Sequence, residues 1–172
     1  KHYGASEYQI EVALMWRSIL FRGDPDRPDK SFGGHVKAHG TSAKIRAVAA
    51  RFDNMGQKNI EARYPLHMHF IEDGGENSVF ASNAVTYSQF RAYTIHGTNK
   101  TLIWNNIVYH AFGHSFYLED GVSQLCRFMY NGAFHILTIG TPAAGPSQTG
   151  DTFTRTSDVF LPADHTASGY YF

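Results

Sequence analysis

The segments FIEDG at residues 70–74, YTIHG at 93–97 and YLEDG at 117–121 share one pattern. Each begins with an aromatic residue and carries an ionisable residue directly before a closing glycine. The closing glycines are 23 and 24 residues apart, which indicates an internal repeat of about 23 residues. We expect these three glycines to form one column in the folded chain.

Three asparagines repeat with almost the same period. Asn83, Asn106 and Asn131 each follow a short apolar segment, at spacings of 23 and 25 residues. Such a period, with several short strands in each unit, is typical of a right-handed parallel β-helix, whose coils stack about 4.8 Å apart. Asparagines at one turn position can hydrogen-bond up such a stack. We therefore interpret the three asparagines as structural.

The composition is that of a folded chain, and its 172 residues suit one domain or a piece of a larger one. Its 15 basic and 15 acidic side chains cancel, and charged residues make up only 17% while aromatic residues reach 15%. This excludes a disordered chain, and the lack of a basic run argues against a nucleic-acid partner. No apolar stretch approaches 18 residues, so we expect no membrane insertion. The single Cys126 cannot form a disulfide within the chain, and we expect a buried thiol.

The predicted fold is all-β, a right-handed parallel β-helix built from stacked coils of about 23 residues. We assign residues 1–40 to leading strands, residues 41–140 to the coils, and residues 141–172 to a loop and a further strand of the same domain. A β-helix needs capped ends, and neither terminus resembles a polar cap. We therefore expect a fragment of a larger β-helix, flanked by other domains of the same protein.

The ionisable residues before the closing glycines are candidates for catalysis. Asp73, His96 and Asp120 would stack on adjacent coils as an Asp–His–Asp ladder, serving either the register of the turns or chemistry. Two rungs would separate the aspartates by roughly 9 to 10 Å, which excludes a retaining glycosidase pair and is marginal for an inverting one. Glu72 and Glu119 would alternate to the opposite face.

Histidines on the same segments suggest a metal site. His67 and His69 share one face of a strand, and His-x-His near acids is a frequent arrangement for zinc or copper. His114 falls at an equivalent position two coils away, too far for one ion to bind all three. The alternative is a row of buried, hydrogen-bonded histidines, and His114 is also a candidate catalytic residue.

Other side chains suggest recognition at the surface. Arg91, near Tyr93 and Tyr117, would suit a polysaccharide with carboxylates, because rings pack on sugar faces and a guanidinium pairs with the acid. A neighbouring domain could equally cover these aromatic residues. Asn99 begins the sequon Asn99-Lys100-Thr101, so it is a candidate glycosylation site.

Five motifs occur in an order that resembles a known family. They are FGGH at 32–35, NMGQ at 54–57, RYPLHMH at 63–69, IHGT at 95–98 and GHSFYLEDG at 113–121. The chain resembles the β-helix region of the fibrocystin family, which includes hyaluronan-depolymerising proteins related to cell-migration-inducing hyaluronan-binding protein. The resemblance implies an extracellular parallel β-helix. Some members depolymerise hyaluronan, whereas fibrocystins are large receptor-like or ciliary-surface proteins.

We therefore expect an extracellular or cell-surface module that binds an acidic, hyaluronan-like glycan. If it cleaves the glycan, hydrolysis would use Asp120 and Asp73 as acid and base, assisted by His96 or His114. The alternative is a non-catalytic structural or adhesion module of a fibrocystin-like surface protein, with other surface proteins as partners. Zero net charge slightly favours this alternative, because proteins that bind polyanions usually have a basic groove. No cofactor is specified, although calcium remains an option.

Overall fold

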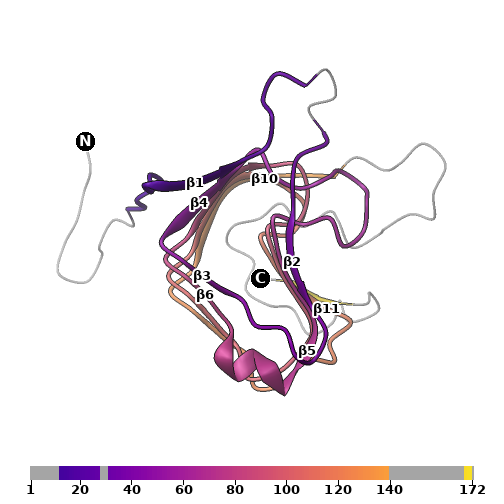
Figure 1. Cartoon of the computed structure of the whole chain (residues 1–172). Coiled ribbons are helices and arrows are strands. Elements are labelled where there is room, and N and C mark those ends of the chain that lie inside the picture. Colours follow the sequence, from indigo (N-terminus) through magenta and orange to yellow (C-terminus); the bar gives the residue numbers. More distant parts are fainter. Residues whose placement is uncertain (1–11, 28–30, 140–168, 172) are drawn as a thin grey trace.

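The computed structural model describes residues 12–27, 31–139 and 169–171. In this part of the chain, short strands wind into stacked three-sided coils around a central core (Figure 1). The all-β parallel β-helix predicted from the repeats is therefore confirmed. Residues 1–11 and 28–30, and all but residues 169–171 of the loop and strand assigned to 141–172, lie outside the described residues.

Three sheets form the three sides. The first sheet contains β1 (Ile19–Arg22), β4 (Ala50–Asp53), β7 (Ala84–Ser88), β10 (Ile107–Phe112) and β13 (Gly132–Leu137). The second sheet contains β2 (Val36–His39), β5 (Leu66–Glu72), β8 (Tyr93–Thr98), β11 (Phe116–Glu119) and β14 (Gly169–Tyr171). The third sheet contains β3 (Arg46–Val48), β6 (Val79–Ala81), β9 (Leu102–Trp104) and β12 (Arg127–Met129). All neighbouring strands pair in parallel except β14, which is antiparallel to β11.

The core fills the inside of the coils because alternate residues of each strand point inward. In the second sheet the inward row of β5 and β8 includes Leu66, Met68, Tyr93 and Ile95, all fully buried. Their neighbours in sequence therefore point outward, and this alternation places the ionisable residues of β5 and β8 on the outer face.

The asparagine ladder is confirmed. The side-chain oxygen of Asn106 accepts hydrogen bonds from the backbone and side-chain amides of Asn83, at 3.0 and 3.1 Å. Asn131 accepts the same pair of bonds from Asn106, at 2.9 and 3.1 Å. Each ladder residue follows a corner residue with positive φ, where the chain turns from the third sheet into the first. The ladder thus satisfies buried polar groups at a sharp turn.

The predicted glycine column is wrong. Leu66 pairs with Tyr93, 27 positions later, because the 3₁₀ helix η1 (Asp73–Asn77) lengthens the link after β5. Gly74 therefore lies within η1, while Gly97 is in contact with Phe70 of the coil before. The pairing of Glu119 with His96 then sets Asp120, rather than a glycine, beside Gly97.

Two of the recognised motifs pair with each other. The Gly33 amide donates to the Gly56 carbonyl at 2.7 Å, and the Gly56 amide donates to the Gly34 carbonyl at 2.6 Å. A Cβ on Gly33 would lie 2.3 Å from the backbone oxygen of Asn54, so only glycine fits there. These motifs hold the loop between β4 and β5 against the loop before β2.

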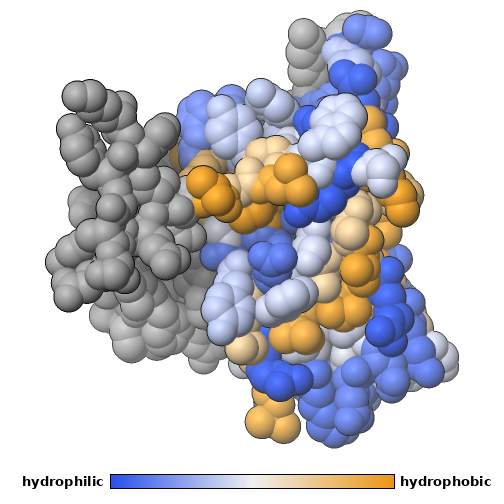
Figure 2. All heavy atoms as spheres, turned by 90° about the vertical axis from the view of Figure 1, so that its left-hand side faces the viewer, coloured by the Kyte–Doolittle hydropathy of each residue, from blue (hydrophilic) through white to orange (hydrophobic). Residues whose placement is uncertain are grey.

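Apolar side chains also occur on the outer surface. Figure 2 shows them among polar residues on the side that carries the first and third sheets. Val48, Trp104 and Met129 occupy one register column of the third sheet and are each 40% exposed or more. The thiol of Cys126 is half-buried near the Thr98 carbonyl, and burial raises its pKa. Among the described residues, no helix has the length and apolar character needed to cross a membrane.

Candidate functional site

A row of ionisable residues runs across the outer face of the second sheet. His39, His69, His96 and Glu119 occupy one register position on four successive strands. His67 lies in the adjacent outward column, two residues before His69. The parallel pairing therefore gathers residues that are up to 80 positions apart in the sequence.

Three of these histidines form a compact group. Each of these residues, His67, His69 and His96, has a ring nitrogen that could bind a metal ion. These three nitrogens all lie within 4.8 Å of one another. The ring centroids of His67 and His69 are 4.9 Å apart, as are those of His69 and His96. We call these three residues the histidine cluster.

Two carboxylates flank the imidazole of His96. Oε2 of Glu119 lies 3.2 Å from Nδ1, and Oδ2 of Asp120 lies 2.6 Å from Nε2. Oε2 of Glu119 is also 3.7 Å from Nε2 of His67. The Glu119 side chain is only 4% exposed, whereas that of Asp120 is 44% exposed. The two acids next to His96 therefore have very different environments.

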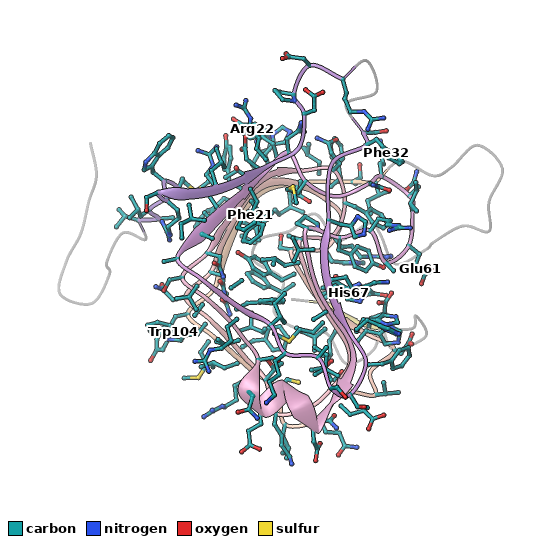
Figure 3. All side chains as sticks on the ribbon, in the orientation of Figure 1. Phe21, Arg22, Phe32, Glu61, His67 and Trp104 are labelled. Carbon is teal, nitrogen blue, oxygen red and sulfur yellow. The ribbon has the colours of Figure 1, made fainter. Side chains whose placement is uncertain are left out.

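The loop at residues 54–65 covers His67, the buried member of the histidine cluster. Tyr64 at its end is fully buried and packs edge-on against His67, with ring centroids 4.9 Å apart. Its hydroxyl donates a hydrogen bond to Oε1 of Glu119 at 3.0 Å. In Figure 3, His67 lies beside the second sheet and Glu61 of this loop lies further out. The loop thus buries His67 although this residue points away from the core.

Burial controls the charges at the site. Desolvation, followed by the neighbouring His69, lowers the pKa of His67 to about 3. Desolvation, followed by His96, lowers the pKa of His69 to about 4. Burial also raises the pKa of Glu119, although the nearby His96 opposes this. The imidazoles of His67 and His69 are therefore neutral near pH 7, and each can offer a nitrogen lone pair.

The predicted recognition residues are placed differently from the prediction. Arg91 is 5% exposed, donates to the hydroxyl of Tyr64 and to Nδ1 of His114 at 3.1 Å each, and lies 4.4 Å above the ring of Tyr117. An exposed Arg91 was therefore the wrong expectation, because the covering loop buries it. Tyr93 lies in the core and stacks on Phe116 at 5.1 Å, so it cannot line a surface site.

Of the predicted Asp–His–Asp ladder, the contact between His96 and Asp120 is present, but the place of Asp73 is wrong. Asp73 lies at the start of η1, where Nζ of Lys100 contacts it at 2.8 Å and Nδ2 of Asn99 donates to it at 3.0 Å. These hydrogen bonds lower the pKa of Asp73. The pairing aligns Glu119 with His96, so Glu119 takes the place that the repeat gave to Asp73. Glycosylation of Asn99 stays a prediction, and its amide nitrogen is held by Asp73.

His96 completes the group that His67 and His69 suggested. The sequence analysis weighed His114, two coils away, as the third histidine and judged it too distant, and in the structure His114 accepts a hydrogen bond from Arg91 and stacks on Tyr117 with centroids 5.0 Å apart. The register column shared by His69 and His96 was the signal that could have found the cluster.

A groove of about 430 Å³ lies over the third sheet, close to η1. It is lined by Arg46, Lys100, Arg127, Glu76 and apolar or polar neighbours. Arg46 and Arg127 occupy one register column on β3 and β12 and are both exposed. Lys100 pairs with Asp73, whereas Arg46 and Arg127 form no ion pair within the described part of the chain. Although the net charge of the chain is zero, this groove is therefore locally basic.

Comparisons with known proteins agree with this architecture. A family model described as CEMIP beta-helix matches residues 31–168. "Communication mutant protein F" of Dictyostelium discoideum is 46% identical over 172 residues, covering 98% of this chain and 15% of its own length. A G8 domain-containing protein of the same organism is 44% identical over 174 residues, covering 99% of this chain and 12% of its own length. The "Cell surface hyaluronidase" of Danio rerio is 29% identical over 142 residues, covering 73% of this chain and 10% of its own length.

The chain thus spans about one seventh of the length of the first of these relatives. No solved structure matches it. The predicted likeness to fibrocystins stays a prediction, while the hyaluronan-related branch of that resemblance is supported by the family model. Because this model covers most of the chain and the strands form stacked parallel coils, the chain belongs to the CEMIP beta-helix family.

Proposed function

We propose that this chain is the glycan-binding β-helix of a cell-surface or extracellular protein, and that it hydrolyses an acidic polysaccharide of the hyaluronan type. The observation that carries the proposal is the His96 imidazole between a buried and an exposed carboxylate. The similarity to a protein named cell surface hyaluronidase supports the substrate class and the location.

The two carboxylates suit opposite roles in hydrolysis. Glu119 is buried and its pKa is raised, so it retains a proton more readily than an exposed carboxyl group. Asp120 is exposed and can accept a proton from water that enters the site. In the hydrolysis, Glu119 would supply the proton to the glycosidic oxygen and Asp120 would take the proton of the attacking water, and His96 lies between the two carboxyl groups. The acid and base proposed from the sequence, Asp73 and Asp120, thus become Glu119 and Asp120.

The basic groove supplies the binding part of the proposal. Guanidinium groups pair with carboxylates in two parallel hydrogen bonds, and Arg46 and Arg127 have no ion pair among the described residues. Lys100, which lines the groove, follows His96 by four residues. A polyanionic chain could therefore contact the groove and the histidine cluster through the same end of β8.

The test is to incubate the full-length protein with long fluorescent hyaluronan and follow the chain length by size-exclusion chromatography. We expect the wild type to shorten the chains and Asp120→Asn to slow shortening by at least about 100-fold, the scale of general acid–base catalysis. Asp120 is exposed, so this variant is expected to fold.

The other outcomes are equally informative. Shortening that continues unchanged in Asp120→Asn would remove the proposed base. Hyaluronan that co-elutes with the protein without shortening would reduce the function to binding. If hyaluronan neither shortens nor co-elutes, the proposal fails and the non-catalytic surface module is favoured.

A further inference from the structure

We propose that the histidine cluster, His67, His69 and His96, binds one divalent transition-metal ion, with zinc as its typical occupant. The inference goes beyond the proposed function, because ion binding requires these side chains and does not depend on whether a glycan is bound or cut. Three imidazoles with ligand atoms inside 4.8 Å approach the spacing that a tetrahedral zinc site needs, with Zn–N bonds of about 2.0 to 2.1 Å.

His67 provides the strongest evidence for a ligand. Its side chain is fully buried, and its Nε2 has no hydrogen-bond partner among the described residues. Its other ring nitrogen, Nδ1, lies 3.4 Å from the Ala62 carbonyl. If Nδ1 carries the proton and donates it there, Nε2 presents a lone pair to the centre of the cluster. Buried polar atoms without a partner are rare, and a bound ion would satisfy this one.

His69 is oriented in the same way by a second residue. Nδ1 of His69 and Nδ1 of His39 are 2.7 Å apart, so one donates a hydrogen bond to the other. This leaves Nε2 of His69 available on the opposite side of the ring. Metal-binding histidines commonly have their second ring nitrogen held by an outer partner, which fixes the direction of the ligand nitrogen.

His96 lies between negative groups that favour a cation. The contacts with Glu119 and Asp120 are short, yet neither ring nitrogen of His96 makes an aligned hydrogen bond. Oε2 of Glu119 lies near both His96 and His67, at 3.2 and 3.7 Å, so this carboxyl group borders the cluster without serving as a ligand, and the fourth position of an ion is left to water. Tyr64 holds the other oxygen of this carboxylate and thereby fixes its orientation.

The type of ligand atom determines which class of metal ion the cluster favours. Imidazole nitrogen suits zinc, copper, nickel and iron, whereas calcium and magnesium prefer oxygen ligands. Three imidazole nitrogens therefore favour zinc-like ions over the calcium considered from the sequence. The lowered pKa values of His67 and His69 help, because a ligand imidazole must be neutral.

The first measurement is zinc content and zinc affinity of the full-length protein, by elemental analysis after gel filtration and by calorimetric titration of the metal-free form. The variant His69→Gln/His96→Gln removes two ligands from half-exposed positions. We expect it to lose one equivalent of zinc and to weaken that binding step by more than about 100-fold.

A matched control is available on the first sheet. His110 and His135 are also neighbours, with ring centroids 4.7 Å apart, yet they belong to no such cluster among the described residues. Both have positive φ, so asparagine is the appropriate replacement. We expect His110→Asn/His135→Asn to retain the zinc equivalent.

A second measurement uses the wild type alone, so it does not depend on whether a variant folds. Cobalt added to the metal-free wild type should give the visible absorption of a four-coordinate site with nitrogen and oxygen ligands, and one equivalent of zinc should remove it. Absence of this absorption, zinc content that is equal in the wild type and the cluster variant, or loss of zinc from the His110/His135 control would each overturn the proposal.

Discussion

Replacing Asn106 with alanine is expected to destabilise the stacked coils by about 4 kcal/mol. The side chain is fully buried, donates to the Phe80 carbonyl at 2.8 Å and accepts two hydrogen bonds from Asn83. Alanine would leave the Asn83 amide and the Phe80 carbonyl without their partners. Each unsatisfied buried group costs about 1 to 3 kcal/mol, which gives a total near 4 kcal/mol for the two.

Hydrogen exchange measured by mass spectrometry tests this in the full-length protein. A loss of about 4 kcal/mol corresponds to roughly 10³-fold faster exchange of amides that open with the ladder, such as that of Asn83. Asn105→Gly is the matched control, because Asn105 is exposed, has a φ of 54° and makes one side-chain bond, to Ser82. Glycine accepts this backbone conformation, so we expect a change below about 1 kcal/mol. Equal exchange rates in the two variants would refute the structural role of the ladder.

Three further predictions concern acid, packing and charge. In metal-free protein the folded-state pKa of His67, about 3, lies below the unfolded value near 6.5, so stability is complete above pH 6.5 and falls as the pH drops toward 3. His67 accounts for about 2 kcal/mol of the stability lost at pH 5, so His67→Asn should reduce the pH-dependent loss seen in urea unfolding by about that amount, while the part due to His69 remains. Gly33→Ala should cost more than about 3 kcal/mol in melting experiments, because its Cβ would overlap a backbone oxygen at 2.3 Å. Arg46→Gln/Arg127→Gln should weaken hyaluronan binding at least about tenfold and reduce its salt dependence, measured by fluorescence anisotropy.

The repeat and its ladder could be predicted because they depend on periodicity alone. Asn83, Asn106 and Asn131 occupy a turn between two short strands, and the spacing there stays at 23 and 25 residues. Inward and outward alternation then follows from the strand geometry. A pattern in one sequence is sufficient for such features.

The site could be predicted only in part because insertions change the register. The helix η1 follows β5, so counting from Gly74 aligned Asp73 with His96 and concealed the role of Glu119. The covering loop, which closes with Tyr64, buries Arg91 although its position on the sheet suggested exposure. Neither the length of an insertion nor the surface that a loop covers can be read from the repeat.

The proposed hydrolytic site is tested most directly by comparing hyaluronan cleavage rates in two variants of the full-length protein. Glu119→Gln removes the buried proton donor beside His96 but can still accept the hydrogen bond from Tyr64. Asp73→Asn changes the acid that repeat counting aligned with His96. The account predicts that Glu119→Gln slows cleavage by at least about 100-fold, while Asp73→Asn stays within about twofold of the wild type. Full activity in Glu119→Gln together with loss of activity in Asp73→Asn would contradict it.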